Sequence, residues 1–409
     1  MNKQLLKKEG EKWVQDGIIT EGQLEQILSR YEKQDKSYIL ILFAVLFMSI
    51  GIIIFAFSDW TQVPAMFRVI LMIISMTLLY LIGHRQYDIT ENTKQKISNM
   101  YGVSFILLGY MFFGATLLLI INVYDITLFN IWPLIIWSFV GLVLYAIYEH
   151  PYILVVGLFI TIFSQLYSLL AYSSFDYIIF LLFLFGYFHF VFHHERKLFS
   201  YLFAIGLSLQ IVLLTMVEFD QYYWFFILIM AMYLLAQIIL KPTLKKALFY
   251  LSIWTVLIFR MYESFMLQDE YFFEQMEVQS LFFVVWIVAF LLLLGVKWFQ
   301  RQKLEFIDVI LFLPYFFLPY NYLFVIVTMF IFAIYWLIVG FQRNLDDKIL
   351  IGIVSFIIST FTAYVQFAWE TLNRSLFFLI GGVILFIISF LLERKRRAIT
   401  PSKKGEDHR

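Results

Sequence analysis

The chain has no cysteine, and proline, glycine and charged residues are scarce: 7 prolines and 18 glycines occur in 409 residues. The lack of cysteine excludes disulfide bonds, Cys-ligated zinc, iron–sulfur clusters and thiol catalysis. Charged residues make up 14% of the chain and hydrophobic residues 62%, and the mean hydropathy is +0.84. A soluble domain is about one-quarter charged. The composition therefore predicts a membrane protein, and the net charge of +1 gives no reason to expect a nucleic-acid partner.

Long hydrophobic runs follow a charged opening segment, and most are close to the roughly 20 apolar residues that a helix needs to cross a bilayer. The first run lies behind 37 residues rich in charge and has no small-residue cleavage site, so we expect no cleaved signal peptide. The expected fold is all-α: a polytopic helical membrane bundle of about 14 transmembrane helices. The predicted spans are 38–57, 66–83, 99–121, 131–148, 152–172, 177–193, 198–216, 223–240, 247–262, 280–297, 304–319, 322–340, 349–366 and 375–392.

Basic residues are missing from every second connection between these runs. If both termini are cytosolic, 27 of the 30 Lys and Arg residues lie on the cytosolic side, and only Arg68, Arg260 and Arg374 lie outside. Such a distribution is typical of the positive-inside rule. The outer connections carry acids instead, as in the loop 263–277. One span more or fewer would invert every later connection, so we predict an even number of spans with both the N and C termini cytosolic.

Three segments follow from this topology. Residues 1–37 are expected to form a small cytosolic helical hairpin and residues 38–392 the polytopic transmembrane domain. Residues 393–409 are expected to be a disordered, basic cytosolic tail.

The hairpin is predicted from its capping signals. Asp16 and Gly17 supply a left-handed stop after a first helix that contains Trp13. Thr20 and Gln23 have the spacing of a capping box, and Ile19 and Leu24 have that of a hydrophobic staple. Two roles remain open: the hairpin folds against its own membrane domain or the head groups, or it docks a protein partner. In the second case the partner-binding residues are Trp13, Gly17, Ile19, Thr20, Gln23 and Leu24.

The opening segment also carries a family resemblance. Trp13-Val-Gln-Asp-Gly17-Ile-Ile19-Thr20-Glu-Gly-Gln23 resembles the signature of bacterial predicted polytopic membrane proteins, the domain of unknown function 2157. Phe57-Ser58-Asp59-Trp60 is similar to the end of that family's first span, although Asp59 occupies a position where the pattern has Asn. Gly114-Ala-Thr116 through Asn122-Val-Tyr124 is similar to a later Gly-rich span. The resemblance covers roughly residues 10–165 and implies a multi-pass protein of the bacterial cytoplasmic membrane, with no implied activity.

The eleventh span is the unusual one, because acids inside a membrane mark function by default. Two prolines five residues apart should break its backbone hydrogen bonding, which a membrane tolerates only where protein or water compensates. The span is either a substrate path or a kinked packing helix whose acids reach the inner interface. The residues of the candidate substrate path are Glu305, Asp308, Pro314, Tyr315, Pro319 and Asn321.

Other chemical motifs are weak. His189 and His193 share a helical face at a spacing that can hold a metal, but no further ligand completes the site, so we expect no metal site. Asp269-Glu270 is an adjacent acidic pair in the longest outer loop, where a solvated loop is the common explanation. No phosphate-binding glycine loop or nucleophile elbow is present.

The sequence favours a carrier or flippase-like protein for an amphiphilic or lipid-linked substrate, because many spans come with few buried charges and one broken span. The alternatives are a non-catalytic envelope scaffold or sensor that binds a cytosolic or membrane partner, and a membrane-embedded glycosyltransferase. We therefore expect a protein of the lipid bilayer without a cofactor, and the sequence favours a non-enzymatic role while leaving an enzyme open. A laterally open cavity with converging polar groups favours transport, outer acids converging on it favour an enzyme, and a solid bundle favours a scaffold.

Overall fold

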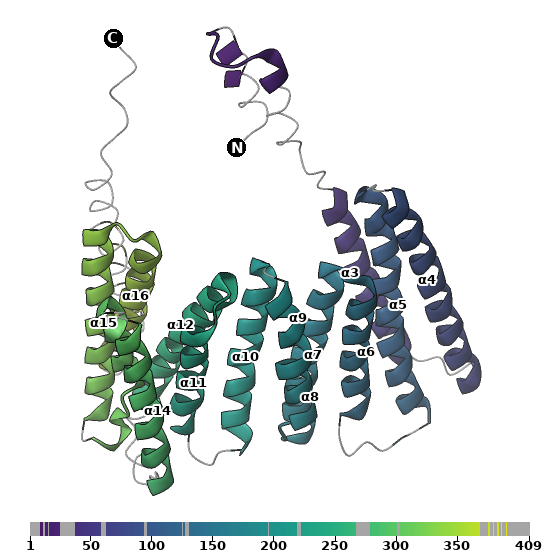
Figure 1. Cartoon of the computed structure of the whole chain (residues 1–409). Helices are drawn as coiled ribbons and strands as arrows, with labels where there is room; N and C mark the ends of the chain where they lie inside the picture. Colours follow the sequence, from purple (N-terminus) through teal and green to yellow (C-terminus); the bar gives the residue numbers. More distant parts are fainter. Residues whose placement is uncertain are drawn as a thin grey trace. The chain divides into compact units, whose positions relative to one another are not determined.

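Every regular element in the described part of the chain is a helix (Figure 1). The protein is represented by a computed structural model. It describes residues 9–10, 13–14, 16–24, 37–58, 63–93, 96–124, 126, 131–194, 196–218, 222–266, 279–300, 303–318, 320–368, 375–376, 379, 383, 386 and 390. Internal contacts divide the chain into two compact units, residues 1–161 and residues 162–409.

The first unit is built around α5 (Lys96–Val123), which packs against both α3 (Ser37–Phe57) and α4 (Ala65–Thr93). α4 and α5 approach closely where Gly83 faces Gly102: a Cβ at Gly102 would lie 3.2 Å from the Gly83 carbonyl oxygen. Small residues at such crossings let two membrane helices pack backbone to backbone. The core where α3, α4 and α5 meet consists of Ala56, Val69, Met72, Ala115 and Leu119.

α6 (Trp132–Tyr148) docks on α5 through a reciprocal pair of hydrogen bonds. The Trp137 indole donates to the Tyr110 carbonyl oxygen at 3.1 Å, and the Tyr110 hydroxyl donates to the Trp137 carbonyl oxygen at 2.8 Å. Gly114 lies directly under the indole, where an added Cβ would overlap the ring. The glycine is therefore required by the close approach of Trp137. α7 (Pro151–Tyr172) follows and continues past the boundary of the unit.

The second unit contains the helices that surround the candidate site. The predicted span 177–193 is a short α-helix, a π-helical turn and another short α-helix, and such π segments are often found at functional positions. The elements in chain order are α8 (Tyr177–Leu181), η1 (Leu182–Tyr187), α9 (Phe188–His193), α10 (Lys197–Glu218), α11 (Trp224–Ile238), α12 (Pro242–Met266), α14 (Ser280–Phe299), α15 (Asn321–Arg343) and α16 (Asp346–Ala368).

The eleventh predicted span is not an α-helix. It forms a 3₁₀-helix, η2 (Lys303–Phe312), and a second 3₁₀ turn, η3 (Tyr315–Phe317), separated by Leu313 and Pro314. Runs of 3₁₀-helix longer than about four residues are uncommon because their hydrogen bonds are poorly aligned. The expected irregular backbone near Pro314 is therefore confirmed, and the break extends further toward the N-terminal end of the span than the prolines alone suggest.

The multi-pass helical architecture is confirmed at the level of helix length and composition. Eight described helices are long and apolar enough to cross a membrane, and four shorter apolar helices coincide with further predicted spans. Most of the last predicted span, 375–392, lies outside the described residues. The total of about 14 spans and the cytosolic side of both termini therefore remain predictions.

Candidate functional site

The broken span is enclosed by helices of the second unit. η2 contacts α12, α14 and α15, and η3 contacts α15. An exposed, irregular backbone would cost several kcal/mol for each unpaired polar group in lipid. Side chains of the surrounding helices therefore have to supply hydrogen-bond partners for this segment, and they do so at both of its ends.

At the N-terminal end, lysine and tyrosine side chains satisfy the carbonyl oxygens of η2. Lys297, on α14, donates through Nζ to the Glu305 carbonyl oxygen at 2.6 Å. Tyr335, on α15, donates through its hydroxyl to the Leu304 carbonyl oxygen at 2.9 Å. These two bonds join the η2 backbone to α14 and α15, and neither involves a side chain of η2.

At the C-terminal end, a buried arginine of α12 has the same role. Arg260 donates through Nε to the Leu311 carbonyl oxygen at 3.0 Å and through Nη2 to the Leu313 carbonyl oxygen. Its Nη1 donates to Glu263 Oε2 at 2.5 Å, and both side chains are fully buried. The guanidinium also lies 4.1 Å from the centre of the Phe226 ring, a favourable cation–π distance. Arg260 thus compensates the backbone that the break leaves open and is itself neutralised by Glu263.

Indole and amide groups complete the set. Trp286, on α14, donates to the Phe312 carbonyl oxygen at 2.9 Å. Asn321, the first residue of α15, donates through Nδ2 to the Phe316 carbonyl oxygen at 3.1 Å. The residue before it, Tyr320, has φ +55°, and this left-handed backbone turns the chain into α15.

Asp308 is the acid at the centre of this arrangement. Its side chain is fully buried, and Oδ2 accepts from the Tyr233 hydroxyl at 2.6 Å while Oδ1 accepts from the Trp336 indole at 2.9 Å. The equally buried Lys297 ammonium lies 3.6 Å from Oδ2 and also donates to the Tyr233 hydroxyl at 2.8 Å. A carboxylate facing lipid would have no such partners. Asp308 therefore joins α11, α14 and α15 to η2.

Glu305 lies at the edge of a cavity rather than beside Asp308. Its carboxylate accepts from Lys348 at 2.8 Å, and these side chains are 26% and 15% exposed. The Lys348 ammonium also lies 4.4 Å from the Phe249 ring centre and 4.2 Å from that of Trp336. Since Trp336 bonds Asp308 and Glu305 bonds Lys297 through its carbonyl, the cavity wall is continuous with the buried Asp308 cluster.

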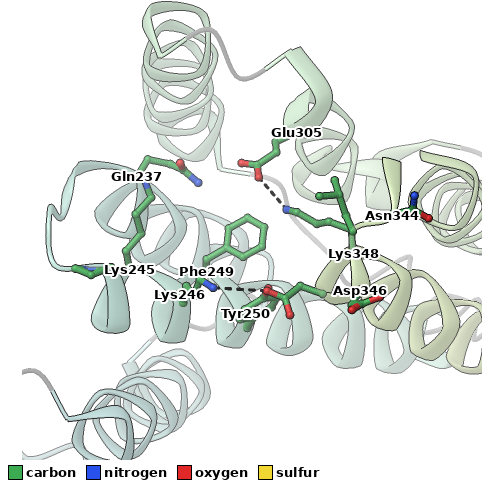
Figure 2. Close-up of a pocket in the computed structure, with 12 residues that line it drawn as sticks. Gln237, Lys245, Lys246, Phe249, Tyr250, Glu305, Asn344, Asp346 and Lys348 are labelled. Carbon is green, nitrogen blue, oxygen red and sulfur yellow. Dashed lines mark hydrogen bonds and ion pairs between the residues drawn. The ribbon is translucent and has the colours of Figure 1, made fainter. Parts of the chain in front are cut away.

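The cavity has a volume of about 450 Å³ and is open on one side. Its walls come from the end of α11, the first turns of α12, η2, and the connection between α15 and α16 (Figure 2). Figure 2 shows the Glu305–Lys348 pair above Phe249, with Gln237 on the opposite side. The charged residues of the lining are Lys245, Lys246, Lys348, Glu305, Asp346 and Asp347. The other lining residues are Gln237, Pro242, Phe249, Tyr250, Asn344 and Leu345.

Two of the charges in the cavity form a second, exposed ion pair. Lys246 Nζ lies 3.6 Å from Asp347 Oδ2, and both side chains are open to solvent. Such a pair contributes little to stability and exchanges partners readily. Lys245 forms no ion pair within the described part of the chain. The cavity therefore combines one partly buried ion pair, one exposed pair and an additional ammonium group.

The structure brings together only some of the predicted substrate-path residues. Glu305 borders the cavity and Asp308 is buried below it. Tyr315 stacks over the Arg260 guanidinium at 5.1 Å, near the opposite end of the broken span. Pro314 precedes η3, Asn321 bonds Phe316, and Pro319 lies outside the described residues. Of the five predicted residues that the structure describes, Glu305 is the one that lines the cavity.

The partners of the acids were missed by sequence analysis. The charge distribution places Lys297 in an inner connection, at the end of an apolar run, yet its side chain is buried against Asp308. Arg260 was one of three exceptions to the charge distribution, and its burial beside Glu263 accounts for that exception. The position of Arg260 on the predicted outer side, against the positive-inside pattern, is the feature of the sequence from which this buried ion pair could have been predicted.

The N-terminal hairpin has the predicted turn. The Ile18 N–H donates to the Trp13 carbonyl oxygen at 2.8 Å, and the Gly17 N–H donates to the Val14 carbonyl oxygen at 3.1 Å. Together with φ +69° at Gly17, this is the Schellman motif that ends a helix. The expected left-handed stop is confirmed.

The predicted capping box is present as well. The Thr20 N–H donates to Gln23 Oε1 at 2.9 Å, and the Gln23 N–H donates to Thr20 Oγ1 at 3.3 Å. Leu24 is buried against Gly10 of the first helix, so the two helices are in contact where they are described. Ile18, in contrast, is exposed at the turn. The turn and the capping box are as expected, while the complete hairpin over residues 1–37 and its partner-binding role stay predictions.

The remaining candidates do not gain support. His193 and His189 lie with ring centres 4.3 Å apart, but no group of three or more possible metal ligands occurs within the described residues. Asp269 and Glu270 lie outside those residues.

Comparison with known proteins supports the family resemblance. The model of a family described as predicted membrane protein (DUF2157) matches residues 11–154, close to the 10–165 expected from the motifs. No curated protein and no solved structure matches the chain. The matched segment holds the hairpin turn and most of the first compact unit. The cavity and the Asp308 cluster lie beyond it, so the family description says nothing about them.

Proposed function

We propose that this multi-pass membrane protein is a carrier or flippase-like protein that binds the polar end of an amphiphilic or lipid-linked molecule in the cavity beside η2. The observation that carries the proposal is the convergence of polar side chains from α11, α12, η2 and α16 on one open cavity of about 450 Å³. A solid bundle would offer no such place. Ligand pockets of about 300–1,000 Å³ are typical of small-molecule sites.

The location of the cavity fits an amphiphile. Lys241, Lys245 and Lys246 belong to a connection that the charge distribution assigns to the cytosol, and Lys348 belongs to another. The cavity would then open at the inner surface of the membrane, where a lipid head group is already concentrated. Under this proposal the membrane is the bacterial cytoplasmic membrane, as the family resemblance implies.

The cavity also has a structural link to the membrane interior. Lys348 contacts Trp336, which bonds Asp308, and η2 replaces a regular span with a backbone held by side chains of three helices. A span held in this way can exchange hydrogen-bond partners without unfolding a regular helix. We infer that η2 is the element that moves when the bound molecule crosses.

A translocation assay tests the proposal. The full chain is reconstituted in vesicles with a fluorescent phospholipid, and the fraction of label that a membrane-impermeant quencher reaches is followed with time. The protein should accelerate exchange between leaflets, and Lys348→Gln should slow it. The matched control is Lys197→Gln, an exposed lysine on the same predicted side but outside the cavity. Exchange no faster than in protein-free vesicles would overturn the proposal.

A scaffold or sensor role is the second candidate, and the hairpin favours it. Its turn carries the Thr20–Gln23 capping box and presents an exposed Ile18. Replacing Ile18 with Asp should then remove a cross-linked partner in cells and leave lipid exchange unchanged. Nothing in the described part of the chain favours a glycosyltransferase.

A further inference from the structure

We propose that the cavity binds a zwitterionic head group that carries a phosphate and a primary ammonium group, as in an aminophospholipid. The inference rests on the proposed function, because it names the ligand class of the same cavity. It follows from the arrangement of charges, from the first turn of α12 and from the aromatic wall.

The charges of the lining are balanced. Three lysines, Lys245, Lys246 and Lys348, face three carboxylates, those of Glu305, Asp346 and Asp347. A ligand with a single negative charge gains attraction from the lysines and an equal repulsion from the acids. A ligand with both charges can satisfy both sets if its own charges are separated in the right direction. The balance therefore favours a dipolar group over a simple anion.

The phosphate position is defined by the first turn of α12. α12 begins at Pro242, which lines the cavity, whereas the first turn of α16 carries Asp346 and Asp347 and would repel a phosphate. Backbone N–H groups at a helix N-terminus attract anions. Lys245 lies in the first turn of α12 without an ion pair among the described residues, and Lys246 is held only by an exposed pair. A phosphate bound here would engage Lys245 and would draw Lys246 away from Asp347.

The ammonium position is already occupied by a side chain of the same chemistry. The Lys348 ammonium lies 2.8 Å from the Glu305 carboxylate and 4.4 Å above the Phe249 ring. This shows that the site accommodates a primary ammonium between a carboxylate and an aromatic face. A ligand ammonium can replace Lys348 there and donate to the Glu305 carboxylate, while the released Lys348 turns to the ligand phosphate. The ligand thus exchanges one ion pair for two.

The surroundings point to a lipid as the source of this head group. Large apolar side chains are exposed where α11 and α14 end, next to the cavity: Leu240, Trp298 and Phe299. The two ends are linked by Gln300 Nε2, which donates to the carbonyl oxygen of the lining residue Gln237 at 2.9 Å. Exposed tryptophan and phenylalanine at the end of a membrane helix belong at the bilayer interface. The cavity therefore opens where acyl chains can remain in the membrane.

Equilibrium binding to the full chain in nanodiscs tests the inference. The probes are short-chain phosphatidylethanolamine, short-chain phosphatidylglycerol with the same acyl chains, and soluble phosphoethanolamine. We expect the ethanolamine lipid to bind at least about tenfold more tightly than the glycerol lipid, the ratio expected for one charge-assisted hydrogen bond. Equal or tighter binding of the glycerol lipid, or no saturable binding of either, would overturn the inference. The comparison needs no variant, so a folding defect cannot obscure it.

The variant Glu305→Gln should change the affinities for the two lipids in opposite directions. Loss of the carboxylate removes the partner of the ligand ammonium and leaves Lys348 free for a phosphate, so the ethanolamine lipid should bind more weakly and the glycerol lipid more tightly. The control Lys197→Gln should change neither affinity. A parallel loss for both lipids would contradict the assigned ammonium position.

The outcomes separate this inference from the proposed function. If soluble phosphoethanolamine binds as tightly as the ethanolamine lipid, the zwitterion site is supported and a lipid source for the head group is refuted. A tenfold preference for the ethanolamine lipid without lipid translocation refutes the carrier function and leaves the head-group site in place. Lipid translocation without this preference supports the carrier function and refutes the head-group site.

Discussion

Replacement of Asp308 by Asn should destabilise the protein strongly, although the two side chains have the same shape. The substitution keeps an acceptor for the Trp336 indole, which donates to Oδ1 at 2.9 Å. It places an amide where Oδ2 now accepts from Tyr233 at 2.6 Å and lies 3.6 Å from the Lys297 ammonium. Lys297 is fully buried and would lose its only described carboxylate neighbour within ion-pair distance.

The magnitude follows from this unpaired charge. Removal of one partner of a buried ion pair costs about 3–5 kcal/mol, because the other charge remains desolvated. Lys297 retains bonds to the Tyr233 hydroxyl and to the Glu305 carbonyl oxygen, which reduces the loss. We expect the free energy of unfolding to fall by about 3 kcal/mol. A purely functional acid would leave stability nearly unchanged.

A double-mutant cycle in bicelles measures the effect. Unfolding free energies are compared for the unmodified protein, Asp308→Asn, Lys297→Met and the combination. The combination should lose at least about 1.5 kcal/mol less than the sum of the single changes, because removal of both charges leaves none unpaired. The control is Asp88→Asn, whose exposed carboxylate lies near His84 at 3.5 Å and should contribute little. Additive single changes, or an Asp308→Asn variant as stable as Asp88→Asn, would refute the assigned pair.

Three other predictions concern the rest of the chain. Gly114→Ala should lower the unfolding free energy by about 1–3 kcal/mol, measured by thermal unfolding, because the Trp137 ring must move. The control is Gly51→Ala, which should be neutral because an added Cβ there meets no atom within 4 Å. Thr20→Ala should cost about 1 kcal/mol of local stability and speed amide hydrogen exchange in the hairpin, whereas Thr20→Ser should preserve the capping box. Reporter fusions at the C-terminus and in the loop 263–279 should report opposite sides of the membrane, and the same side would show that the number of spans is wrong.

Local features of the fold could be predicted because their causes are local. Gly17 and Thr20 specify the hairpin turn through neighbours within five residues, and the prolines near 314 specify a broken span. The length of the 3₁₀ segment was not predictable, since it depends on Arg260 and Lys297 from other helices.

The candidate site could be predicted only in part because its contacts join distant segments. Tyr233 lies 75 residues from Asp308 and Trp336 lies 28 residues from it, so no spacing rule brings these side chains together. The helices are apolar on most faces, and hydrophobic periodicity then carries little information about which face meets which neighbour. Glu305 and Asp308 were recognised as unusual, whereas the cavity beside them required the packing of α12 against α16.

The way η2 is held also sets an order for biogenesis. Arg260 and Lys297 are translated before residues 303–318, but Trp336 and Lys348 leave the ribosome afterwards. A nascent chain that ends soon after η3 has only half of the hydrogen-bond partners for this segment, so its stable integration must wait for the helices that follow. Since the chain has no cysteine of its own, Val309→Cys can report the delay: the thiol should react in chains released after residue 320 and be protected in the full chain. Equal protection in both would mean that the earlier helices suffice. Protection in the full chain alone would mean that η2 integrates stably into the bilayer only after α15 and α16 have been synthesised.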